Sequence, residues 1–335
     1  MTSTTSEITS EARRLIVVGS GSQELWAPVF AALAEQYELV TIDRDYPTWQ
    51  GSYAKKHRIA DITNSSMLFH AVADLRGEVA DASVITWNPH SVLPLAVAAR
   101  KLRIRYFSPD AVSDAADTLE VRAAVAEAGL PVVPWQLFYI EDDVVGAGER
   151  IGYPVVLRAR RRGTAGVSYA ASEGDLREAF VDVAGRSAAG VVADDGVLIE
   201  QYIDGTELNV HSAVSSGRAV PIAAVRAIFD ADDPLRATGY EAQSLAGESW
   251  SGQVEEVVGA VHSRLGIDFG VTNTTLRVTA DGLRVIGVDT CLTGELIGAL
   301  GTTGIDLVKA AAAIGFEREP VLSAAGSVGG LISLS

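Results

Sequence analysis

Short apolar runs alternate with amphipathic segments over the first 110 residues. Four runs rich in β-branched and aromatic residues predict strands, namely Leu15–Gly19, Leu39–Asp43, Ala82–Trp87 and Ile104–Phe107. Between them, apolar residues recur at helical spacing over Glu24–Tyr37, Ser66–Leu75 and Leu93–Leu102. Because strands that alternate with helices are joined by crossover connections, this region predicts a small doubly wound domain with a parallel sheet.

An alanine-rich segment over Asp110–Gly129 predicts one long helix. Gly129 is followed by a Leu-Pro-Val-Val-Pro run that ends at Pro134. A glycine after the last helical turn with proline beyond it is a stop signal. We therefore expect a hinge between domains at this point.

The second half of the chain favours strands in adjacent pairs. Five further strands are predicted before residue 230, over Tyr153–Arg158, Val167–Ala171, Gly196–Ile203, Glu207–Val214 and Ala219–Phe229. An Ala280-Asp281-Gly282 turn joins two more, Gly270–Thr279 and Leu283–Asp289, into a predicted hairpin. Helices are expected over Ser172–Arg186, Val254–Leu265 and Ile305–Gly315. This half predicts α+β architecture.

Composition narrows the class of protein. With 335 residues and 48% apolar content, the chain can form two or three domains with buried cores. Its formal net charge of −16 argues against nucleic acid or an anionic membrane as the main partner. The single cysteine excludes a disulfide framework, and no apolar run approaches the ~20 residues of a membrane span. We expect a soluble cytoplasmic protein with a flexible Ser/Thr/Glu-rich leader.

Two features near the ends of strands favour structural roles. Gly19 to Ser22 follow the first strand but lack the third glycine of a dinucleotide fingerprint, so they predict a tight strand-to-helix turn. Five histidines show no metal-ligand spacing, namely His57, His70, His90, His211 and His262. We expect all five to be structural.

A cluster of arginines stands out in this acidic chain. Arg158, Arg160, Arg161 and Arg162 run directly into the loop Gly163–Gly166. In a strand, Arg158 and Arg160 face the same side. Cations beside backbone N–H groups of a glycine loop suit phosphate or carboxylate binding.

The segment Leu198–Val210 carries two glutamates seven residues apart, Glu200 and Glu207. It resembles the hinge of the ATP-grasp superfamily of ATP-dependent carboxylate–amine and carboxylate–thiol ligases. The resemblance implies that backbone groups at Gln201 and Ile203 bind the adenine edge and that Glu207 binds the ribose hydroxyls. A carboxylate can accept two hydroxyl hydrogen bonds, and a strand backbone offers the donor and acceptor that adenine needs.

The resemblance extends from Leu15 to Gly315. Further similar segments are Ser108–Asp117, Gly129–Pro134, Tyr153–Arg158, the Gly270–Gly294 hairpin and Thr303–Leu307. It implies an ATP-grasp-like α/β fold with these parts: a leader (1–13), a doubly wound domain (14–110), a linker helix and hinge (111–135), a lid (136–205), a C-terminal subdomain (206–320) and a tail (321–335). It also implies that a homodimer is possible.

Several positions depart from the family pattern. The usual phosphate-binding lysine after Asp117 is Thr118, and the strand lysine is Arg158. The first and second metal glutamates align with Thr275 and Gly287, the metal asparagine with Asp289, and the substrate or phosphate arginine with Cys291. Only Asp289 keeps a carboxylate at a metal position, so the sequence predicts loss of tight binding of two Mg²⁺ ions.

Three functions remain open. The first is a diverged ATP-grasp protein that binds ATP, another adenine nucleotide or an anionic small ligand without standard ligation. The expected contacts of that ligand are Arg158, Arg160, Arg162, Gly163, Gly166, Glu200, Gln201, Ile203 and Glu207. The second is an active carboxylate–amine ligase, with Asp289 on Mg²⁺ and Arg158 or Arg226 as candidate catalytic residues. The third is a scaffold or partner protein that keeps only the fold.

Overall fold

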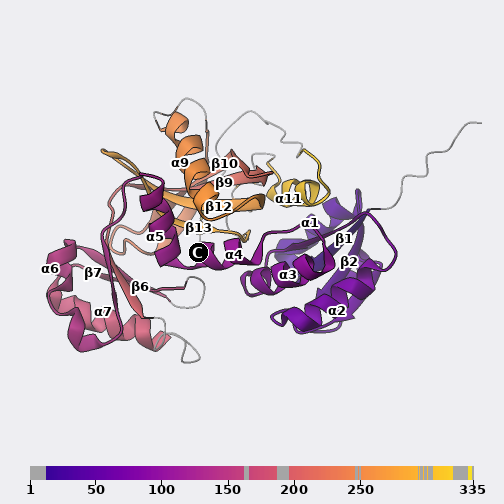
Figure 1. Cartoon of the computed structure of the whole chain (residues 1–335), viewed down its shortest axis with the longest axis horizontal. Coiled ribbons are helices and arrows are strands. Elements are labelled where there is room, and N and C mark those ends of the chain that lie inside the picture. The colour runs from indigo at the N-terminus through magenta and orange to yellow at the C-terminus, as the bar shows by residue number, and fades with distance from the viewer. Residues whose placement is uncertain are drawn as a thin grey trace, which may run out of the picture. The chain divides into compact units, whose positions relative to one another are not determined.

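The computed structural model describes residues 13–161, 166–186, 196–245, 248, 250–292, 294, 297, 300, 305–319 and 331–333. The predicted leader up to residue 12, Arg162, Gly163, Thr303, Gly304 and most of the predicted tail lie outside these residues. The chain divides into two compact units: one runs to Tyr106 and includes Gly315–Arg318, and the other runs from Phe107 to Ile314. The labels of Figure 1 are used for both.

The first unit is the predicted doubly wound domain. Its four-stranded sheet has the order β3-β2-β1-β4, and all its pairings are parallel. The strands are β1 (Arg14–Val18), β2 (Glu38–Asp43), β3 (Lys56–Ile59) and β4 (Ala82–Thr86). The helices are α1 (Gln23–Ala34), α2 (Ser65–Arg76) and α3 (Pro89–Leu102), with a 3-10 turn at Trp49–Ser52. The apolar pattern did not predict β3, because three of its four residues are polar and largely solvent-exposed.

Apolar periodicity explains how the helices pack on this sheet. Ile16 and Val40 of the sheet share a buried core with Leu68 of α2 and Leu95 of α3. The side chains of Asn64 and Asn88 cap the N-termini of α2 and α3 by accepting hydrogen bonds from backbone N–H groups. The residues spaced three and four apart therefore face the sheet once these caps fix where each helix begins.

The Gly19–Ser22 segment is a tight turn closed from within. The Ser20 N–H and the Ser20 hydroxyl both donate to the Asp43 carboxylate, each at 2.6 Å. Gly21 has φ +75°, and a Cβ there would lie 2.4 Å from the Trp26 ring. The predicted structural role of this turn is confirmed, since an internal carboxylate takes the N–H group that an anion would need.

Two predictions about the chain between the first and second halves were wrong. Ile104–Phe107 pairs with no described strand: the Ile104 N–H closes the end of α3 on Ala99, and the Phe107 ring packs on Phe269. The helix expected over Asp110–Gly129 is two helices, α4 (Pro109–Ala116) and α5 (Thr118–Glu127). Asp117 interrupts them in an extended conformation because its side chain caps α5 by accepting from the Leu119 N–H at 3.0 Å.

The second unit contains a four-stranded antiparallel sheet of order β5-β8-β6-β7, called the lid sheet below because it lies in the segment predicted as a lid. Its elements are β5 (Trp135–Phe138), a 3-10 turn (Glu141–Val144), α6 (Ala147–Ile151), β6 (Val155–Ala159), β7 (Val167–Ala170), α7 (Glu173–Arg186) and β8 (Val197–Gln201). One face of the sheet buries Leu157 and Ile199 against Leu176 and Phe180 of α7. This leaves the opposite face, which carries Arg158 and Glu200, for other contacts.

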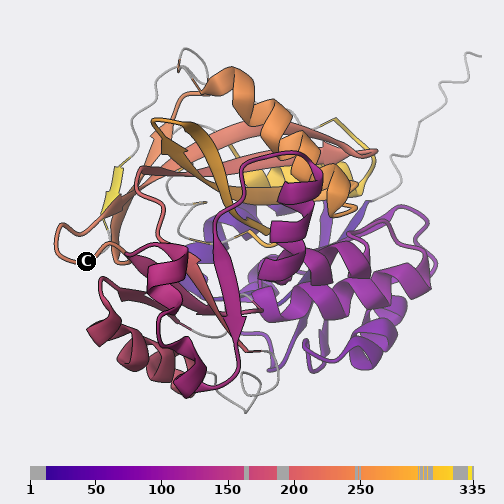
Figure 2. The same cartoon turned by 60° about the vertical axis from the view of Figure 1, so that its left-hand side comes forward.

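The larger sheet of this unit is antiparallel and six-stranded, with the order β13-β12-β9-β10-β11-β14. Its strands are β9 (Thr206–Ser215), β10 (Arg218–Phe229), β11 (Ala237–Gln243), β12 (Phe269–Thr279), β13 (Gly282–Asp289) and β14 (Leu331–Ser333). Two helices complete the described chain, α9 (Ser251–Arg264) and α11 (Leu307–Gly315). Figure 2 shows α9 lying across the sheet, where Val254, Val258 and Val261 are buried. The predicted α/β architecture is confirmed.

No helix among the described residues has the length and apolar content that a membrane crossing requires.

Candidate functional site

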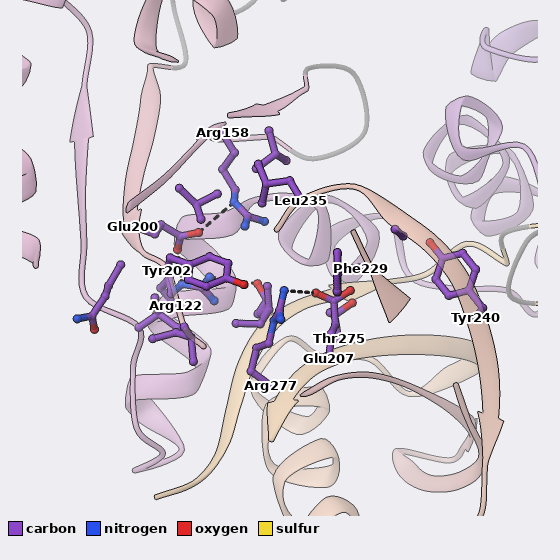
Figure 3. Close-up of a pocket in the computed structure, with 17 residues that line it drawn as sticks. Arg122, Arg158, Glu200, Tyr202, Glu207, Phe229, Leu235, Tyr240, Thr275 and Arg277 are labelled. Carbon is purple, nitrogen blue, oxygen red and sulfur yellow. Dashed lines mark hydrogen bonds and ion pairs between the residues drawn. The ribbon is translucent and has the colours of Figure 1, made fainter. Parts of the chain in front are cut away.

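A cavity of about 260 Å³ lies within the second unit, between the lid sheet and the six-stranded sheet (Figure 3). Its walls come from β6, the end of β8 with the two residues that follow, and strands β9 to β13. Apolar and aromatic groups alternate with a few charged ones, among them Arg158, Glu207 and Arg277. A concave, mainly apolar site with a few convergent polar groups is the usual form of a small-molecule site.

Residues Glu200–Ile203, at the end of β8, line one side of this cavity and are called the hinge below. Glu200 stands opposite Val156 of β6 and Trp135 of β5, so its position follows from the antiparallel register of β8. Its carboxylate is only 2% exposed and is held by two arginines. The Arg122 Nε donates to Glu200 Oε1 at 2.6 Å, and Arg158 Nε pairs with Oε2 at 3.1 Å.

Arg122 ties the hinge to β13. Its two terminal nitrogens donate to the Val285 and Ile286 carbonyl oxygens at 3.0 and 3.1 Å, and its side chain is 1% exposed. A buried ion needs several such partners to offset the cost of leaving water. Arg122 was not predicted from the sequence. Its spacing places it on the same face of α5 as the buried Thr118 and Val125, which indicates that its charge is buried as well.

The chain that leaves β8 forms one wall of the cavity. The Gln201 N–H donates to the Pro134 carbonyl and the Tyr202 N–H donates to the Pro154 carbonyl, both at 2.9 Å. These bonds fix the backbone of the segment, and Ile203 follows it along the cavity wall. The structure therefore brings Gln201, Ile203 and Arg158 together, as the predicted adenine and phosphate contacts require.

Glu207 lies on the opposite wall and is paired with an arginine that we did not predict. Its Oε2 lies 2.9 Å from the Arg277 Nη2 (Figure 3). The pair faces across β9 and β12 in register, and Glu207 is 19% exposed against 8% for Arg277. The Arg277 guanidinium also lies 4.9 Å from the Phe229 ring centre and 5.5 Å from that of Tyr202.

The other predicted cations that the structure describes lie outside the cavity lining. Arg160 donates to both oxygens of the buried Asp117 carboxylate at 2.9 and 3.0 Å, and Arg161 lies 3.9 Å from one of them. Arg226 pairs with Glu241 across β10 and β11, and is largely exposed. Gly166 is partly buried and does not line the cavity either.

The predicted metal positions lie on the β12–β13 hairpin. A bulge at Ile286 places Thr275 opposite Gly287, and two residues along each strand Asn273 stands opposite Asp289. Thr275 lines the cavity, and its hydroxyl donates to Asn209 Oδ1 at 3.2 Å. Asn273 donates to the same oxygen at 3.0 Å. This part of the sheet therefore carries the neutral polar side chains of Asn209, Asn273 and Thr275, joined by hydrogen bonds.

Cys291 follows this hairpin closely and is a weak nucleophile. Burial, followed by the nearby Asp289 carboxylate, raises the pKa of its thiol to about 12. The thiol is therefore protonated at neutral pH, and only the thiolate is reactive.

The buried polar side chains of β9 and β12, among them Asn209, His211 and Asn273, form a polar strip. The buried His262 of α9 contacts this strip at Thr272. Burial lowers the pKa of both His211 and His262 to about 4, so both are neutral at pH 7. His262 lies 2.7 Å from the Val258 carbonyl and 2.8 Å from the Thr272 hydroxyl. Neither ring nitrogen of His211 meets a hydrogen-bond partner among the described residues.

The residues present fit an adenine nucleotide better than they fit two metal ions. The cavity offers aromatic and aliphatic walls, a carboxylate on one side and a guanidinium on the other. Among the described residues, no three His, Cys, Asp or Glu side chains gather closely enough to share a metal ion. Asp289, the carboxylate of the predicted metal positions, is not among the residues that line this cavity. Thr275 and Gly287 supply no further carboxylate.

Comparison with known proteins agrees with this geometry. Residues 151–298 match the family of ATP-grasp domains. The chain is 34% identical over 112 residues to the β subunit of an ADP-forming succinate–CoA ligase from Haloarcula marismortui, a match that covers 32% of this chain and 29% of that protein. The chain thus matches less than a third of the length of this curated relative.

Solved structures show the same architecture over nearly the whole chain. An L-amino acid ligase from Bacillus licheniformis superposes with a TM-score of 0.72 at 18% identity, covering 91% of this chain and 74% of that one. A biotin carboxylase from Campylobacter jejuni in complex with β-γ-ATP gives 0.72 at 18% identity, covering 90% and 70%. Residues 151–298 thus match the ATP-grasp domain family, and the chain shares its fold with these ligase and carboxylase structures.

Proposed function

We propose that this protein binds an adenine nucleotide in the cavity and acts as an ATP-dependent carboxylate–amine ligase. The observation that carries the proposal is that Glu207 and Arg158 line the same cavity, one wall of which is formed by the segment from Gln201 to Ile203. These are the groups that an adenosine with a phosphate chain needs. The ligase and the nucleotide-bound carboxylase that share the fold support the same use of the site.

The nucleoside would occupy the part of the cavity between the hinge segment and β9. Val156 and Ile286 supply apolar surface for the base, and the backbone at Gln201 and Ile203 supplies its polar contacts. The carboxylate of Glu207 accepts hydrogen bonds from the ribose hydroxyls. Glu200 takes no direct part, because both of its oxygens are engaged by Arg122 and Arg158.

Arg158 serves the phosphate side. Its side chain is 16% exposed, pairs with Glu200 and lines the cavity (Figure 3). A guanidinium held in this way can bind phosphate oxygens at two points. Asp289 would hold a Mg²⁺ ion, which, when bound, neutralises negative charge on the phosphates.

The reaction of a carboxylate–amine ligase proceeds in two displacements. A substrate carboxylate oxygen attacks the γ-phosphorus of ATP, so that an acyl phosphate forms and ADP leaves. An amine then attacks the acyl carbon and displaces inorganic phosphate. In this chain, Arg158 orients the phosphates for the first step, and the buried hinge around Glu200 fixes Arg158.

A second function is favoured by one specific observation. Thr275 and Gly287 leave the hairpin with a single carboxylate, Asp289, at the three aligned metal positions. A protein with this hairpin can bind a nucleotide and use it for regulation or partner recognition without transferring phosphate. The removal of one electrostatic contact in such a site commonly lowers the rate by about 10²–10³.

Calorimetric titration with ATP, with and without Mg²⁺, followed by a screen of amino-acid pairs for ADP release, separates these functions. The ligase predicts binding that Mg²⁺ strengthens and ADP release that one acid and one amine together stimulate. Binding without ADP release across a broad panel supports the second function. If the folded protein binds neither ATP nor ADP, both are wrong and a scaffold role remains.

A further inference from the structure

Arg277 is a charged residue of the cavity wall that neither the sequence patterns nor the proposed chemistry used. It lies on β12 directly opposite Glu207 of β9, and the two side chains form an ion pair at 2.9 Å. Of the two, Glu207 is the more accessible, and both line the cavity. The pair therefore presents its carboxylate, rather than its guanidinium, to a ligand.

The Arg277 guanidinium is fixed from three further directions. Its Nη1 donates to the Gly205 carbonyl at 2.9 Å, and the Tyr202 and Phe229 rings lie on it as cation–π partners. Gly205 has φ +138°, and a Cβ there would lie 2.4 Å from the Val278 carbonyl oxygen. Only glycine therefore allows this carbonyl to reach Arg277.

The fixed guanidinium of Arg277 restricts the orientation of the Glu207 carboxylate. A carboxylate on its own rotates among several orientations, whereas one that is paired to a fixed guanidinium keeps a single orientation. A carboxylate offers about four lone-pair positions, and the contact with Arg277 uses one of them on Oε2. The other positions stay available to two neighbouring hydroxyl donors.

We infer that Arg277 is a positioning residue that holds Glu207 ready for the two ribose hydroxyls and thereby makes the site select ribonucleotides over 2′-deoxyribonucleotides. The inference rests on the proposed nucleotide-binding function. Arg277 does not touch the reacting atoms. Its contribution is the orientation and the negative charge of Glu207.

A purely structural role for the pair makes a different prediction. Cross-strand Arg–Glu pairs also stabilise a sheet without any ligand, as Arg226 and Glu241 do on the neighbouring strands. A structural pair would affect the binding of ATP and 2′-deoxy-ATP equally. A positioning pair changes the ratio of the two dissociation constants, because only one nucleotide has the 2′-hydroxyl.

The experiment measures by calorimetry the dissociation constants of ATP and 2′-deoxy-ATP for the full chain and for Arg277→Met, Arg277→Lys and Glu207→Gln. Arg218→Met is the matched control, since Arg218 forms an exposed ion pair with Glu255 away from the cavity. We expect wild type and the control to prefer ATP by about tenfold or more. Arg277→Met and Glu207→Gln should reduce the preference to about threefold or less, and Arg277→Lys should restore part of it.

Circular dichroism confirms that each variant is folded, and the lysine variant decides the question if the methionine variant is not. An unchanged ratio in folded Arg277→Met or Arg277→Lys overturns the inference and leaves nucleotide binding intact. A wild-type protein that binds both nucleotides equally also overturns it. If wild type binds neither, the proposed function itself fails.

Discussion

The hinge around Glu200 and the polar strip of β9 and β12 use buried polar groups in opposite ways. At the hinge, one carboxylate that is 2% exposed is held by two arginines from α5 and β6. Along the strip, Asn209, His211 and Asn273 are buried but neutral, and the single ion pair lies where Glu207 meets the cavity. The charged groups of the hinge therefore pair with one another, whereas along the strip the Glu207–Arg277 pair places charge in the cavity wall.

The comparison also separates two glutamates that look alike in sequence. Glu200 and Glu207 are seven residues apart and both belong to the resemblance to ATP-grasp ligases. Each oxygen of the Glu200 carboxylate pairs with a guanidinium group. Glu207 pairs with Arg277 through Oε2, and its Oε1 lies outside that ion pair. The number of buried cations around a carboxylate therefore decides whether it supports the fold or meets a ligand.

The largest expected effect is at the hinge. Arg122→Met leaves Glu200 buried with Arg158 as its remaining described cation and removes the donors to β13. We expect the free energy of unfolding to fall by about 3–5 kcal/mol, because the buried carboxylate loses one of its two cations and two buried carbonyls lose their donors. Urea unfolding followed by circular dichroism measures this loss.

Arg264→Met is the matched control for that variant. Arg264 lies 4.0 Å from Glu127 at the end of α5, and both side chains are more than half exposed. We expect a change within about 0.5 kcal/mol. Equal stabilities of the Arg122 and Arg264 variants would remove the distinction between the hinge and the surface.

The strip predicts a pH dependence through His211. Burial lowers the pKa of His211 from its ordinary value of 6.5 to about 4. Between these two pH values, the imidazole is protonated in the unfolded chain but neutral in the folded chain. Stability therefore falls as the pH drops from 6.5 to about 4, by about 1.4 kcal/mol per pH unit from this group. His211→Gln should remove this share of the slope in urea unfolding at a series of pH values.

The exposed His90 on α3 provides the comparison for that slope. His90→Gln should keep the wild-type pH dependence, since the side chain is exposed and lies away from the buried polar strip. If His211→Gln and His90→Gln have the same slope, His211 is not neutral in the folded protein.

On the hairpin, Asp289 is the sole carboxylate of the aligned metal positions. Asp289→Asn should lower the rate of ADP release by about 100-fold and weaken the effect of Mg²⁺ on ATP affinity. Asp281→Asn changes an exposed carboxylate in the turn of the same hairpin and should leave both quantities unchanged. Retention of the full Mg²⁺ effect in Asp289→Asn would exclude Asp289 as the ligand.

The smallest expected effect is on nucleotide affinity at the edge of the strip. Glu207→Gln keeps the shape of the side chain and an oxygen acceptor for Arg277 but removes the charge. We expect ATP affinity to fall about tenfold, with a smaller loss of stability than in Arg122→Met. Titration calorimetry and urea unfolding of the same preparation test both parts, and an unchanged ATP affinity would place the ribose elsewhere.

The sequence predicted local features of this molecule better than distant contacts. Alternating strands and helices predicted the doubly wound domain, and Asp281-Gly282 predicted the hairpin turn. The bulge at Ile286 sets Thr275 opposite Gly287. The apolar pattern did not predict it, because a bulge adds a single residue to one strand.

The roles of the arginines depended on contacts between segments far apart in the chain. Arg160 was predicted beside a phosphate, but the structure places it on Asp117, 43 residues away. Arg122 reaches Glu200 and two carbonyls of β13, more than 160 residues further on. The partners in these pairs are far apart in the chain. A local sequence pattern therefore shows which residues are cationic but not which groups they contact.

A crystal structure of the full chain with ATP and Mg²⁺ tests the central claim most directly. The account predicts the base against the backbone of Gln201 to Ile203, the ribose hydroxyls on Glu207, and the phosphates extending toward Arg158. A nucleotide bound outside this cavity, or a cavity that stays without nucleotide at saturating ATP, would contradict it.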